Sequence, residues 1–363
     1  MKIIISAGGT GGHIYPALSI INKIKEKEPN SQFIYIGTHN RMEKDIVPKQ
    51  NIPYESIEIY GFNKRKLHKN FKTIACIFKS YKKCKKIINE FKPDVVIGVG
   101  GYVTVPVILA ATKKGIPTFL HEQNTLPGKA NIFLSKYVSK IGVSFKSSIE
   151  SFPKYKAVFT GNPCSEDAKN IKPINKKELD LKENKKLVLV VMGSLGASTF
   201  NNYFINNINL FKNKDYEVIF ITGKTDYDVI SKEKFPSNIK VFPFIENLPK
   251  VMKKVDVLVT RAGASTLSEL IELSVPSILI PSPFVANNHQ YLNAVTLTDE
   301  DAAILLEEKD LKDDILIKKI DYLLIDKNIK KIKNNLKKLK IEDSSLKIYE
   351  EIKKLVGKKW KIN

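Results

Sequence analysis

The sequence predicts two doubly wound α/β domains that face each other across a cleft. Three observations lead to this fold class. Short β-branched runs alternate with helical stretches along most of the chain, which is typical of parallel sheets covered by helices. A buried run followed by a glycine turn opens each half, at residues 3–12 and at residues 187–197. The length of 363 residues suits about two domains, and the 43% of hydrophobic residues suffices for packed cores.

The first strand and helix flank the turn that is richest in glycine. Residues 3–5 predict a buried strand, and glycines fill four of the five positions from 8 to 12. A helix follows, with Pro16 in its first turn, because apolar residues recur at helical spacing: Ile14, Ala17, Leu18, Ile21 and Ile24. Backbone N–H groups at such a helix start suit a phosphate, and His13 would lie at the mouth of that site. The alternative is a tight turn in which His13 only caps or packs.

Further strands of the first half end in glycine-rich or polar turns. We predict them at residues 32–37, 54–59, 94–99, 117–121, 139–144 and 157–160, with a helix at residues 103–112. One of them ends in His121-Glu122-Gln123-Asn124, and strand ends are the usual place for ligand contacts in α/β sheets. The alternative for His121 and Glu122 is capping of the loop. The turn Gly161-Asn162-Pro163 predicts a domain boundary, which gives domains at residues 1–162 and 163–363.

Residues 59–89 contain many basic residues and no acidic residue. Apolar residues recur within this segment at helical spacing: Leu67, Phe71, Ile74, Phe78 and Tyr81. A basic amphipathic helix is typical of a membrane surface. The alternative is a helix that packs on the core and exposes a lysine face to solvent.

The second half repeats the alternation of strands and helices. We predict strands at residues 187–191, 217–222, 239–244, 255–260 and 275–280, and a Lys-rich helical tail from residue 311. After the fourth of these strands, Ser265, Thr266 and Ser268 at a helix start could hold phosphate, and Glu269 could accept hydrogen bonds from a ribose diol. We therefore expect a nucleotide-sugar diphosphate in the second half, with its sugar directed at His13.

Composition and motif spacing exclude several classes. The formal net charge is +22, yet only 3 of the 60 basic residues are Arg, which weakens base-specific nucleic-acid recognition and leaves attraction to acidic lipid open. The three cysteines have no ligand spacing, which fits a reducing cytosol without structural zinc. No Gly-Lys-Ser/Thr follows the glycine turns, and no acidic residue ends the second strand, so neither a P-loop nor a dinucleotide site is predicted. Without a membrane-spanning run or a signal peptide, we expect a soluble or peripheral protein.

The ordered motifs resemble those of the MurG family of GT-B glycosyltransferases, which join N-acetylglucosamine to undecaprenyl-diphospho-muramoyl-pentapeptide. The motifs that carry the resemblance extend over roughly residues 1–300 and are the segments 8–17, 98–102, 121–124, 161–163, 193–197, 261–269 and 288–294. The resemblance implies a GT-B fold of two Rossmann-like domains. The first domain would bind the lipid acceptor and the membrane. The second would bind the donor, UDP-N-acetylglucosamine, and the C-terminal helix would pack back on the first domain.

The resemblance also implies roles for particular residues. Ile245 would contact the uracil through its backbone, and Glu269 would hold the ribose. The donor diphosphate would be held by Ser194, Ala264, Ser265, Thr266, Leu267 and Ser268. Gln290 and Asn124 would bind the sugar hydroxyls. The remaining substrate contacts would come from Thr10, Gly11, Gly12 and Asn131.

The implied chemistry is inverting and needs neither a metal nor a cofactor. The 4-hydroxyl of the acceptor attacks the anomeric carbon, and a base takes its proton. His13 is the first candidate, because an imidazole can take up a proton near neutral pH, and Glu122 or His121 is the second. Helix dipoles and N–H groups would stabilise the departing diphosphate. Asp-x-Asp triplets occur at residues 226–228 and 299–301, but such triplets arise easily in an acid-containing chain, so no metal role is assigned.

The implied partners are the two substrates and an anionic membrane surface on its cytoplasmic side, without nucleic acid. Other proteins of cell-wall synthesis are candidate partners. Two alternatives remain: a GT-B enzyme that acts on another glycolipid or a small aglycone, and a basic nucleic-acid-binding protein. The sequence also departs from the family, because Cys164 and Ser165 stand where an Arg usually follows Gly-Asn-Pro, and Leu195 stands where a Gln is usual.

Overall fold

The computed structural model describes residues 1–60, 70–193 and 196–357. The chain divides into two compact units, the first formed by residues 1–164 and 342–363 and the second by residues 165–341. The division therefore falls after Cys164, and the end of the chain belongs to the first unit rather than to the second.

The first unit contains a seven-stranded parallel sheet in the order β3-β2-β1-β4-β5-β6-β7. Its strands are β1 (Lys2–Ala7), β2 (Gln32–Thr38), β3 (Tyr54–Ile57), β4 (Val95–Gly100), β5 (Thr118–Glu122), β6 (Lys140–Val143) and β7 (Ala157–Phe159). Its helices are α1 (Gly11–Lys27), α2 (Glu43–Ile46), α3 (Asn70–Phe91), α4 (Thr104–Lys113), α5 (Lys129–Leu134) and α14 (Ser344–Gly357). The order reverses at β1, as in doubly wound sheets, and ligands bind such sheets beside this switch point.

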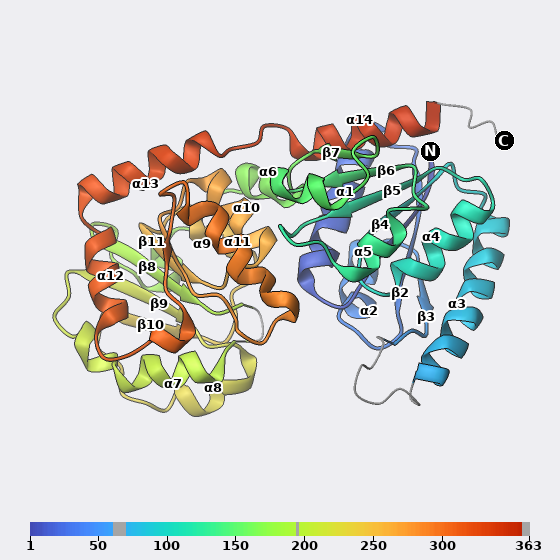
Figure 1. Cartoon of the computed structure of the whole chain (residues 1–363). Helices are drawn as coiled ribbons and strands as arrows, with labels where there is room; N and C mark the ends of the chain where they lie inside the picture. Colours follow the sequence, from blue (N-terminus) through green and yellow to red (C-terminus); the bar gives the residue numbers. More distant parts are fainter. Residues whose placement is uncertain (61–69, 194–195, 358–363) are drawn as a thin grey trace. The chain divides into compact units, whose positions relative to one another are not determined.

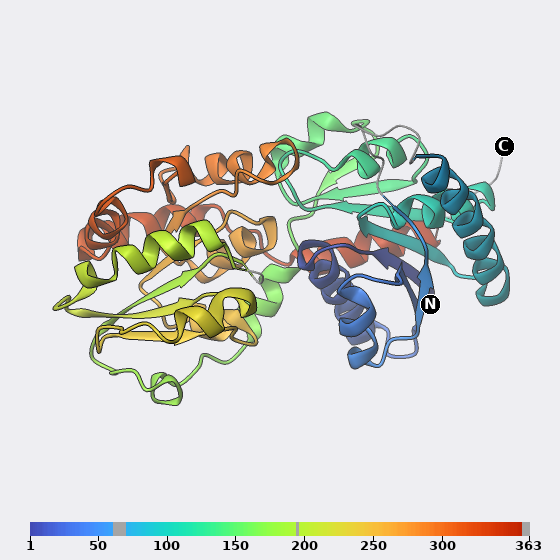
Figure 2. The same cartoon turned by 90° about the horizontal axis from the view of Figure 1, so that it is seen from below.

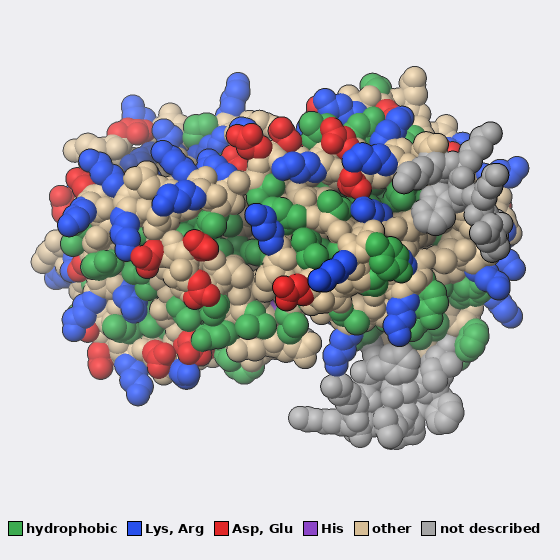
Figure 3. All heavy atoms as spheres, turned by 45° about the horizontal axis from the view of Figure 1, so that its top comes forward, with side chains coloured by type: hydrophobic (Ala, Val, Ile, Leu, Met, Phe, Trp, Pro, Cys, Tyr) green, Lys and Arg blue, Asp and Glu red, His purple; other side chains and the backbone are tan. Residues whose placement is uncertain are grey.

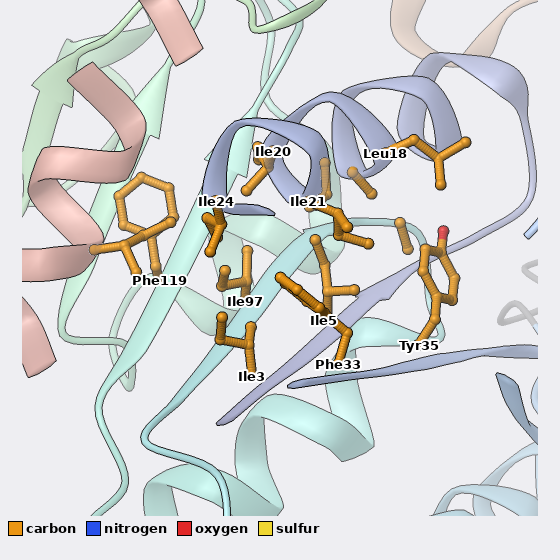
Figure 4. Packing of buried hydrophobic residues seen from close by; sticks show 14 of the residues in the cluster. Ile3, Ile5, Leu18, Ile20, Ile21, Ile24, Phe33, Tyr35, Ile97 and Phe119 are labelled. Atoms are coloured by element: carbon orange, nitrogen blue, oxygen red, sulfur yellow. The ribbon is translucent and has the colours of Figure 1, made fainter. Parts of the chain in front are cut away.

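The alternating residues of the central strands pack on both faces of this sheet. Ile3 and Ile5 of β1 lie in the core with α1 and α14, whereas Ile4 lies in the core with α3 and α4. Figure 4 shows Ile21 and Ile24 of α1 facing the strand residues of the first core. A strand that is buried on both faces needs apolar residues at every position, which explains the unbroken run at residues 3–5.

The last helix, α14, completes the first unit. Ile348, Ile352 and Leu355 lie in the same core as α1, and the hydroxyl of Tyr349 donates a hydrogen bond of 3.0 Å to Glu28 at the end of α1. Figure 1 shows α14 beside α1 in this unit, with α3 and α4 on the other side of the sheet. The C-terminal segment is thus part of the hydrophobic core that supports the glycine turn.

The second unit contains a six-stranded parallel sheet in the order β10-β9-β8-β11-β12-β13. Its strands are β8 (Lys186–Val191), β9 (Tyr216–Ile221), β10 (Ile239–Phe242), β11 (Val257–Thr260), β12 (Ser277–Leu279) and β13 (Ile304–Leu305). Its helices are α6 (Cys164–Asn170), α7 (Ser198–Asn206), α8 (Lys224–Ile230), α9 (Leu248–Met252), α10 (Ala264–Leu273), α11 (His289–Thr298), α12 (Ile315–Leu323) and α13 (Asp326–Lys338). Figures 1 and 2 show helices on both sides of this sheet. The prediction of two doubly wound parallel domains is confirmed.

Some local predictions were wrong. Helix α1 begins at Gly11, so Pro16 lies inside the helix rather than in its first turn. Gly11 and Gly12 are the first two residues of the helix although glycine has a low helix propensity. The short helices α5 and α6 and the two-residue strand β13 carry too few residues for a periodic signal.

Among residues 1–60, 70–193 and 196–357, no helix is both long and apolar enough to cross a bilayer.

Candidate active site

The glycine turn of the first unit holds the imidazole of His13. Nδ1 of His13 lies 3.0 Å from the carbonyl oxygen of Gly8. Because a carbonyl oxygen can only accept, Nδ1 carries the hydrogen of this bond. In the neutral ring, Nε2 therefore has the free lone pair. The turn thus fixes which nitrogen of His13 can accept a proton.

A second glycine turn, at the end of β4, closes on the first. The N–H of Gly8 donates to the carbonyl oxygen of Gly100 over 3.3 Å. A Cβ atom on Gly100 would lie 2.6 Å from Cδ2 of His13, and one on Gly101 would lie 2.5 Å from the carbonyl oxygen of Gly8. Both Gly100 and Gly101 also have positive φ angles of 116° and 88°. Bare backbone is therefore needed at both positions to seat the imidazole.

Thr10, Gly11 and Gly12 form the start of α1 beside His13. Thr10 is the N-cap residue with extended backbone, and its side chain makes no capping hydrogen bond. Its carbonyl oxygen accepts from the N–H groups of His13 and Ile14. The N–H groups of Gly11 and Gly12 lie in the first turn of this 17-residue helix, where backbone N–H groups lack partners within the helix and an anion is stabilised.

His121 is buried in the sheet and has both ring nitrogens engaged. Nε2 lies 3.0 Å from the carbonyl oxygen of Gly161, and Nδ1 lies 3.0 Å from Nε2 of Gln123. The carbonyl oxygen requires a hydrogen on Nε2 of His121, so Nδ1 accepts from the amide. Burial lowers the pKa of His121 to about 4. The ring is thus neutral near pH 7 and links β5 to the turn after β7.

Glu122 organises the loop that follows β5. Its Oε1 accepts from the backbone and side-chain nitrogens of Asn124, at 2.9 and 3.2 Å. Its Oε2 accepts from the N–H of Gly128 at 3.0 Å and from the side chain of Asn131 at 2.9 Å. The carboxylate is buried, and these donors occupy both of its oxygens. This geometry favours the capping role for Glu122 and makes Asn131 a support of the loop.

In the second unit, the start of α10 presents a helix N-terminus with polar side chains. The N-cap residue, Gly263, has no side chain, and Oγ of Ser265 is buried without a hydrogen-bond partner among the described residues. Ser268 donates to the carbonyl oxygen of Ala264 over 2.9 Å, and Leu267 is fully buried in the core. Leu267 can therefore reach a ligand only through its backbone. Thr266 stays partly exposed in the same turn.

Glu269 lies one turn further along α10. Burial raises the pKa of Glu269 to about 8, and the negative charge of Asp167 on α6 contributes to the same shift. The residue nevertheless keeps part of its surface accessible. A carboxyl group that is costly to ionise in the free protein would gain stability from hydroxyl donors, as a ribose diol would supply.

The other residues that were predicted to bind the sugar nucleotide lie in separate segments of this unit. Ile245 is partly exposed between β10 and α9. Gln290 at the start of α11 accepts a hydrogen bond of 2.9 Å from the N–H of Ser282, which orients its amide. Ser194 and Leu195 lie outside the described residues.

The position where the family usually carries an Arg is buried here. Cys164 is buried with its Sγ 3.8 Å from the hydroxyl of Ser19, and its N–H donates to Oδ1 of Asn162 over 3.1 Å. Ser165 is buried as well. Neither side chain supplies the charge of the family Arg.

The two Asp-x-Asp triplets have other contacts. Asp226 accepts from the side chains of Ser198 and Asn201, at 3.1 and 2.7 Å, and Asp301 pairs with Lys331 at 2.9 Å. In the part of the chain that the structure describes, no three His, Cys, Asp or Glu side chains are grouped as metal ligands would be.

Sequence reasoning missed Glu43, which lies on α2. Glu43 is fully buried, and it accepts hydrogen bonds from the N–H of Gly9 and from the N–H and hydroxyl of Thr38, at 3.2, 3.0 and 2.6 Å. The only signal in the sequence is an acidic residue in a short polar segment after the second strand, and periodicity cannot distinguish such a residue from a surface one.

Comparison with known proteins agrees with this arrangement. Residues 3–143 match the Glycosyltransferase family 28 N-terminal domain, and residues 187–347 match the Glycosyltransferase family 28 C-terminal domain. A relative from Bacillus cereus, named UDP-N-acetylglucosamine--N-acetylmuramyl-(pentapeptide) pyrophosphoryl-undecaprenol N-acetylglucosamine transferase 1, is 47% identical over 99% of this chain and 100% of its own length. A relative from Bacillus subtilis, with the same name without the number, is 46% identical over 91% of this chain and 93% of its own.

Solved structures agree as well. The crystal structure of Acinetobacter baumannii MurG matches with a TM-score of 0.77 and 26% identity, over 97% of this chain and 99% of that chain. CalG4, the calicheamicin glycosyltransferase, shares the fold at 13% identity with a TM-score of 0.73, over 99% of both chains. The chain therefore has the GT-B fold and belongs to glycosyltransferase family 28, within its MurG group of N-acetylglucosaminyltransferases.

Proposed function

We propose that this enzyme transfers N-acetylglucosamine from UDP-N-acetylglucosamine to the 4-hydroxyl of the muramoyl sugar in undecaprenyl-diphospho-muramoyl-pentapeptide, with His13 as the general base. The observation that carries the base assignment is the hydrogen bond from Nδ1 of His13 to Gly8, which leaves Nε2 as the acceptor. The hydroxyl oxygen attacks the anomeric carbon from the face opposite UDP, the C–O bond to the diphosphate breaks, and Nε2 takes the hydroxyl proton. The product carries the inverted β-linkage.

The second unit would hold the donor. Ser265, Thr266 and the N–H groups at the start of α10 would bind the diphosphate, and their fixed dipoles would stabilise the negative charge that develops on the leaving group. Glu269 would accept hydrogen bonds from the ribose. Gln290 would bind the sugar, because the contact of its oxygen with Ser282 leaves its NH2 group as the donor. Asn124 is held by Glu122 and would bind the sugar from the first unit.

The first unit would bind an anionic membrane surface on its cytoplasmic side, where a lipid-linked acceptor and a nucleotide sugar can meet. On α5 and just after it, the apolar side chains of Ile132, Phe133 and Tyr137 are exposed, with Lys129 and Lys136 beside them in sequence. Apolar side chains flanked by cations are typical of an interfacial site.

The described part of α3 gives a more limited contribution than its sequence predicted. Cys84, Ile87 and Ile88 pack in the core, and Tyr81 packs partly against it, so the apolar stripe here is mainly structural. Phe78 is 65% exposed and remains available to a membrane. Residues 61–69, including Leu67, lie outside the described residues, and the side chains of Phe71 and Ile74 are likewise not described.

The charge of the molecule supports a diffuse attraction to anionic lipid. Lys and Arg side chains are spread widely over the face drawn in Figure 3, among fewer acidic side chains. Such a distribution accelerates association with an acidic surface without selecting a sequence of bases. Other proteins of cell-wall synthesis remain candidate partners at this surface.

Turnover of UDP-N-acetylglucosamine with a short-chain lipid acceptor tests the proposal. We expect UDP release and a disaccharide product, at a rate that EDTA does not change. Absence of product with the muramoyl acceptor but product with a diacylglycerol or small aglycone would refute the acceptor assignment. A rate abolished by EDTA would refute the metal-independent mechanism. Binding to RNA but not to anionic liposomes would refute the membrane assignment.

A further inference from the structure

A buried carboxylate and the proposed base contact opposite ends of one peptide group. Glu43 Oε2 accepts from the N–H of Gly9 over 3.2 Å, and His13 Nδ1 donates to the carbonyl oxygen of Gly8 over 3.0 Å. The carbonyl of Gly8 and the N–H of Gly9 belong to the same peptide bond, which is trans, so they point in opposite directions. The sequence of contacts is therefore carboxylate, peptide group, imidazole.

Glu43 is placed to act as an acceptor only. Its carboxylate accepts hydrogen bonds from the backbone N–H groups of Gly9 and Thr38 and from the Thr38 hydroxyl. A backbone N–H cannot accept, so the ionised carboxylate satisfies this arrangement better than a protonated acid or an amide would. The site is fully buried, where such charge-assisted bonds are strong and an unsatisfied group is costly.

The surrounding glycines make room for this carboxylate. A Cβ atom on Gly8 would lie 2.5 Å from Glu43 Oε1, and one on Gly37 would lie 2.8 Å from Cγ of Glu43. Gly8 and Gly9, just after β1, therefore both lie against Glu43, and Gly9 also donates a hydrogen bond to it. The carboxylate and the turn that holds the imidazole are built as one unit.

We propose that Glu43 is a positioning residue for His13, which orients the imidazole and increases the basicity of Nε2 through the Gly8–Gly9 peptide. This inference rests on the proposed role of His13 as base. A carboxylate bonded to a peptide N–H polarises that peptide, so its carbonyl oxygen becomes a stronger acceptor for the Nδ1–H of His13. When Nε2 takes the proton of the acceptor hydroxyl, the positive charge on the ring is stabilised by the same chain of bonds.

The two tyrosine hydroxyls packed around Glu43 stay protonated near neutral pH. The hydroxyls of Tyr35 and Tyr54 come from β2 and β3, and burial followed by the charge of Glu43 raises the pKa of both above its ordinary value. Asp45 on α2 adds to the shift of Tyr54. The Tyr54 hydroxyl donates to the carbonyl oxygen of Thr38, and so it supports the same corner. Within the first unit, these neighbours leave Glu43 as the charged group that is linked to His13 by hydrogen bonds.

The test compares Glu43→Gln with Thr38→Val in the full-length protein. The Gln side chain keeps the size of Glu but removes the charge, whereas Val removes the Thr38 hydroxyl and leaves the carboxylate on Gly9. NMR titration of the His13 ring measures its pKa directly, without substrate. We expect Glu43→Gln to lower that pKa by about half a pH unit or more, and Thr38→Val to leave it within about 0.2 unit.

Kinetics separate this inference from the proposed function. We expect Glu43→Gln to lower kcat at least about tenfold with an almost unchanged KM for the donor. The acidic limb of the pH–rate profile should move to lower pH, because the pKa of the base falls. An unchanged His13 titration in a folded Glu43→Gln variant would overturn the inference. A shifted titration with an unchanged kcat would support the linkage and reject His13 as the base. If Glu43→Gln does not fold, Glu43→Asp must show a shifted titration, and a wild-type titration there overturns the inference.

Discussion

The imidazole of His13 occupies the space that a side chain at Gly100 would need. A Cβ atom at that position would lie 2.6 Å from Cδ2 and 2.8 Å from Nε2 of the ring. The end of β4 thus selects the position of a side chain on α1. Helix α1 follows β1, and β1 pairs with β4 in the sheet.

We expect Gly100→Ala to displace His13 and to lower kcat by at least about tenfold, because misplacing a reacting group by about 1 Å can cost about 100-fold. Steady-state kinetics of UDP release measure the effect. Gly115→Ala is the matched control, because Gly115 also has a positive φ, of 69°, but lies after α4 and away from His13. Equal losses of kcat in both variants would show that backbone strain, and not displacement of the ring, is responsible.

His13→Ala removes the proposed base. We expect kcat to fall by about 10²- to 10⁴-fold, with little change in the dissociation constant of UDP-N-acetylglucosamine, because the donor is proposed to bind the second unit. Single-turnover kinetics and a binding titration measure the two quantities. His39→Ala, an exposed histidine after β2, serves as the control. A near-normal kcat in His13→Ala would contradict the base assignment.

Glu122→Gln tests whether this carboxylate caps the loop or takes a proton. Both carboxylate oxygens of Glu122 accept hydrogen bonds from N–H groups, and the NH2 group of Gln would face some of these donors instead. We therefore expect the free energy of unfolding to fall by about 1–3 kcal/mol. Thermal unfolding measures this loss, and the exposed Glu90→Gln should change stability by less than about 0.5 kcal/mol. A large loss of kcat, together with loss of the acidic limb of the pH–rate profile and without a loss of stability, would instead identify Glu122 as the base.

Glu269 predicts a pH dependence of stability. Its pKa is raised to about 8 in the folded protein, from an ordinary value of 4.5, so the unfolded chain releases the proton first as the pH rises. The free energy of unfolding should therefore fall between about pH 4.5 and pH 8 through this group. We expect Glu269→Gln to remove this contribution, so its melting temperature exceeds that of the wild type increasingly across the window. Glu246→Gln, at an exposed position, should follow the wild type. Parallel melting curves for Glu269→Gln and the wild type would contradict the shift.

The exposed aromatic residue on α5 predicts membrane binding. Phe133 is 46% exposed and packs against Tyr137 with the two rings tilted and their centroids 5.5 Å apart. We expect Phe133→Ser to weaken binding to anionic liposomes about tenfold, because a buried aromatic side chain contributes about 1.5–3 kcal/mol. Tyr322→Ser is the matched control on α12 of the second unit, where the side chain is 53% exposed. Equal effects of the two variants in a liposome co-sedimentation assay would contradict a site on α5.

The alternation of strands and helices predicted both sheets, because parallel strands that are covered on two faces require continuous apolar runs. The run at residues 3–5 and the run at residues 187–191 became central strands of the two units. The family was also predicted correctly. Its motifs can be read from the sequence because each is a short local segment, and their order along the chain is specific.

The sequence by itself determined the fold class, the glycine turns and the set of polar residues at the strand ends. Only the tertiary structure decided which of them face one another: Gly100 with His13, Glu122 with Asn131, and Glu43 with Gly9. The physical reason is that these contacts join segments that are distant in sequence, so no local periodicity or propensity encodes them. A carboxylate on a four-residue helix becomes fully buried because two glycines, Gly8 and Gly37, leave space around it, and that space exists only once the strands are paired.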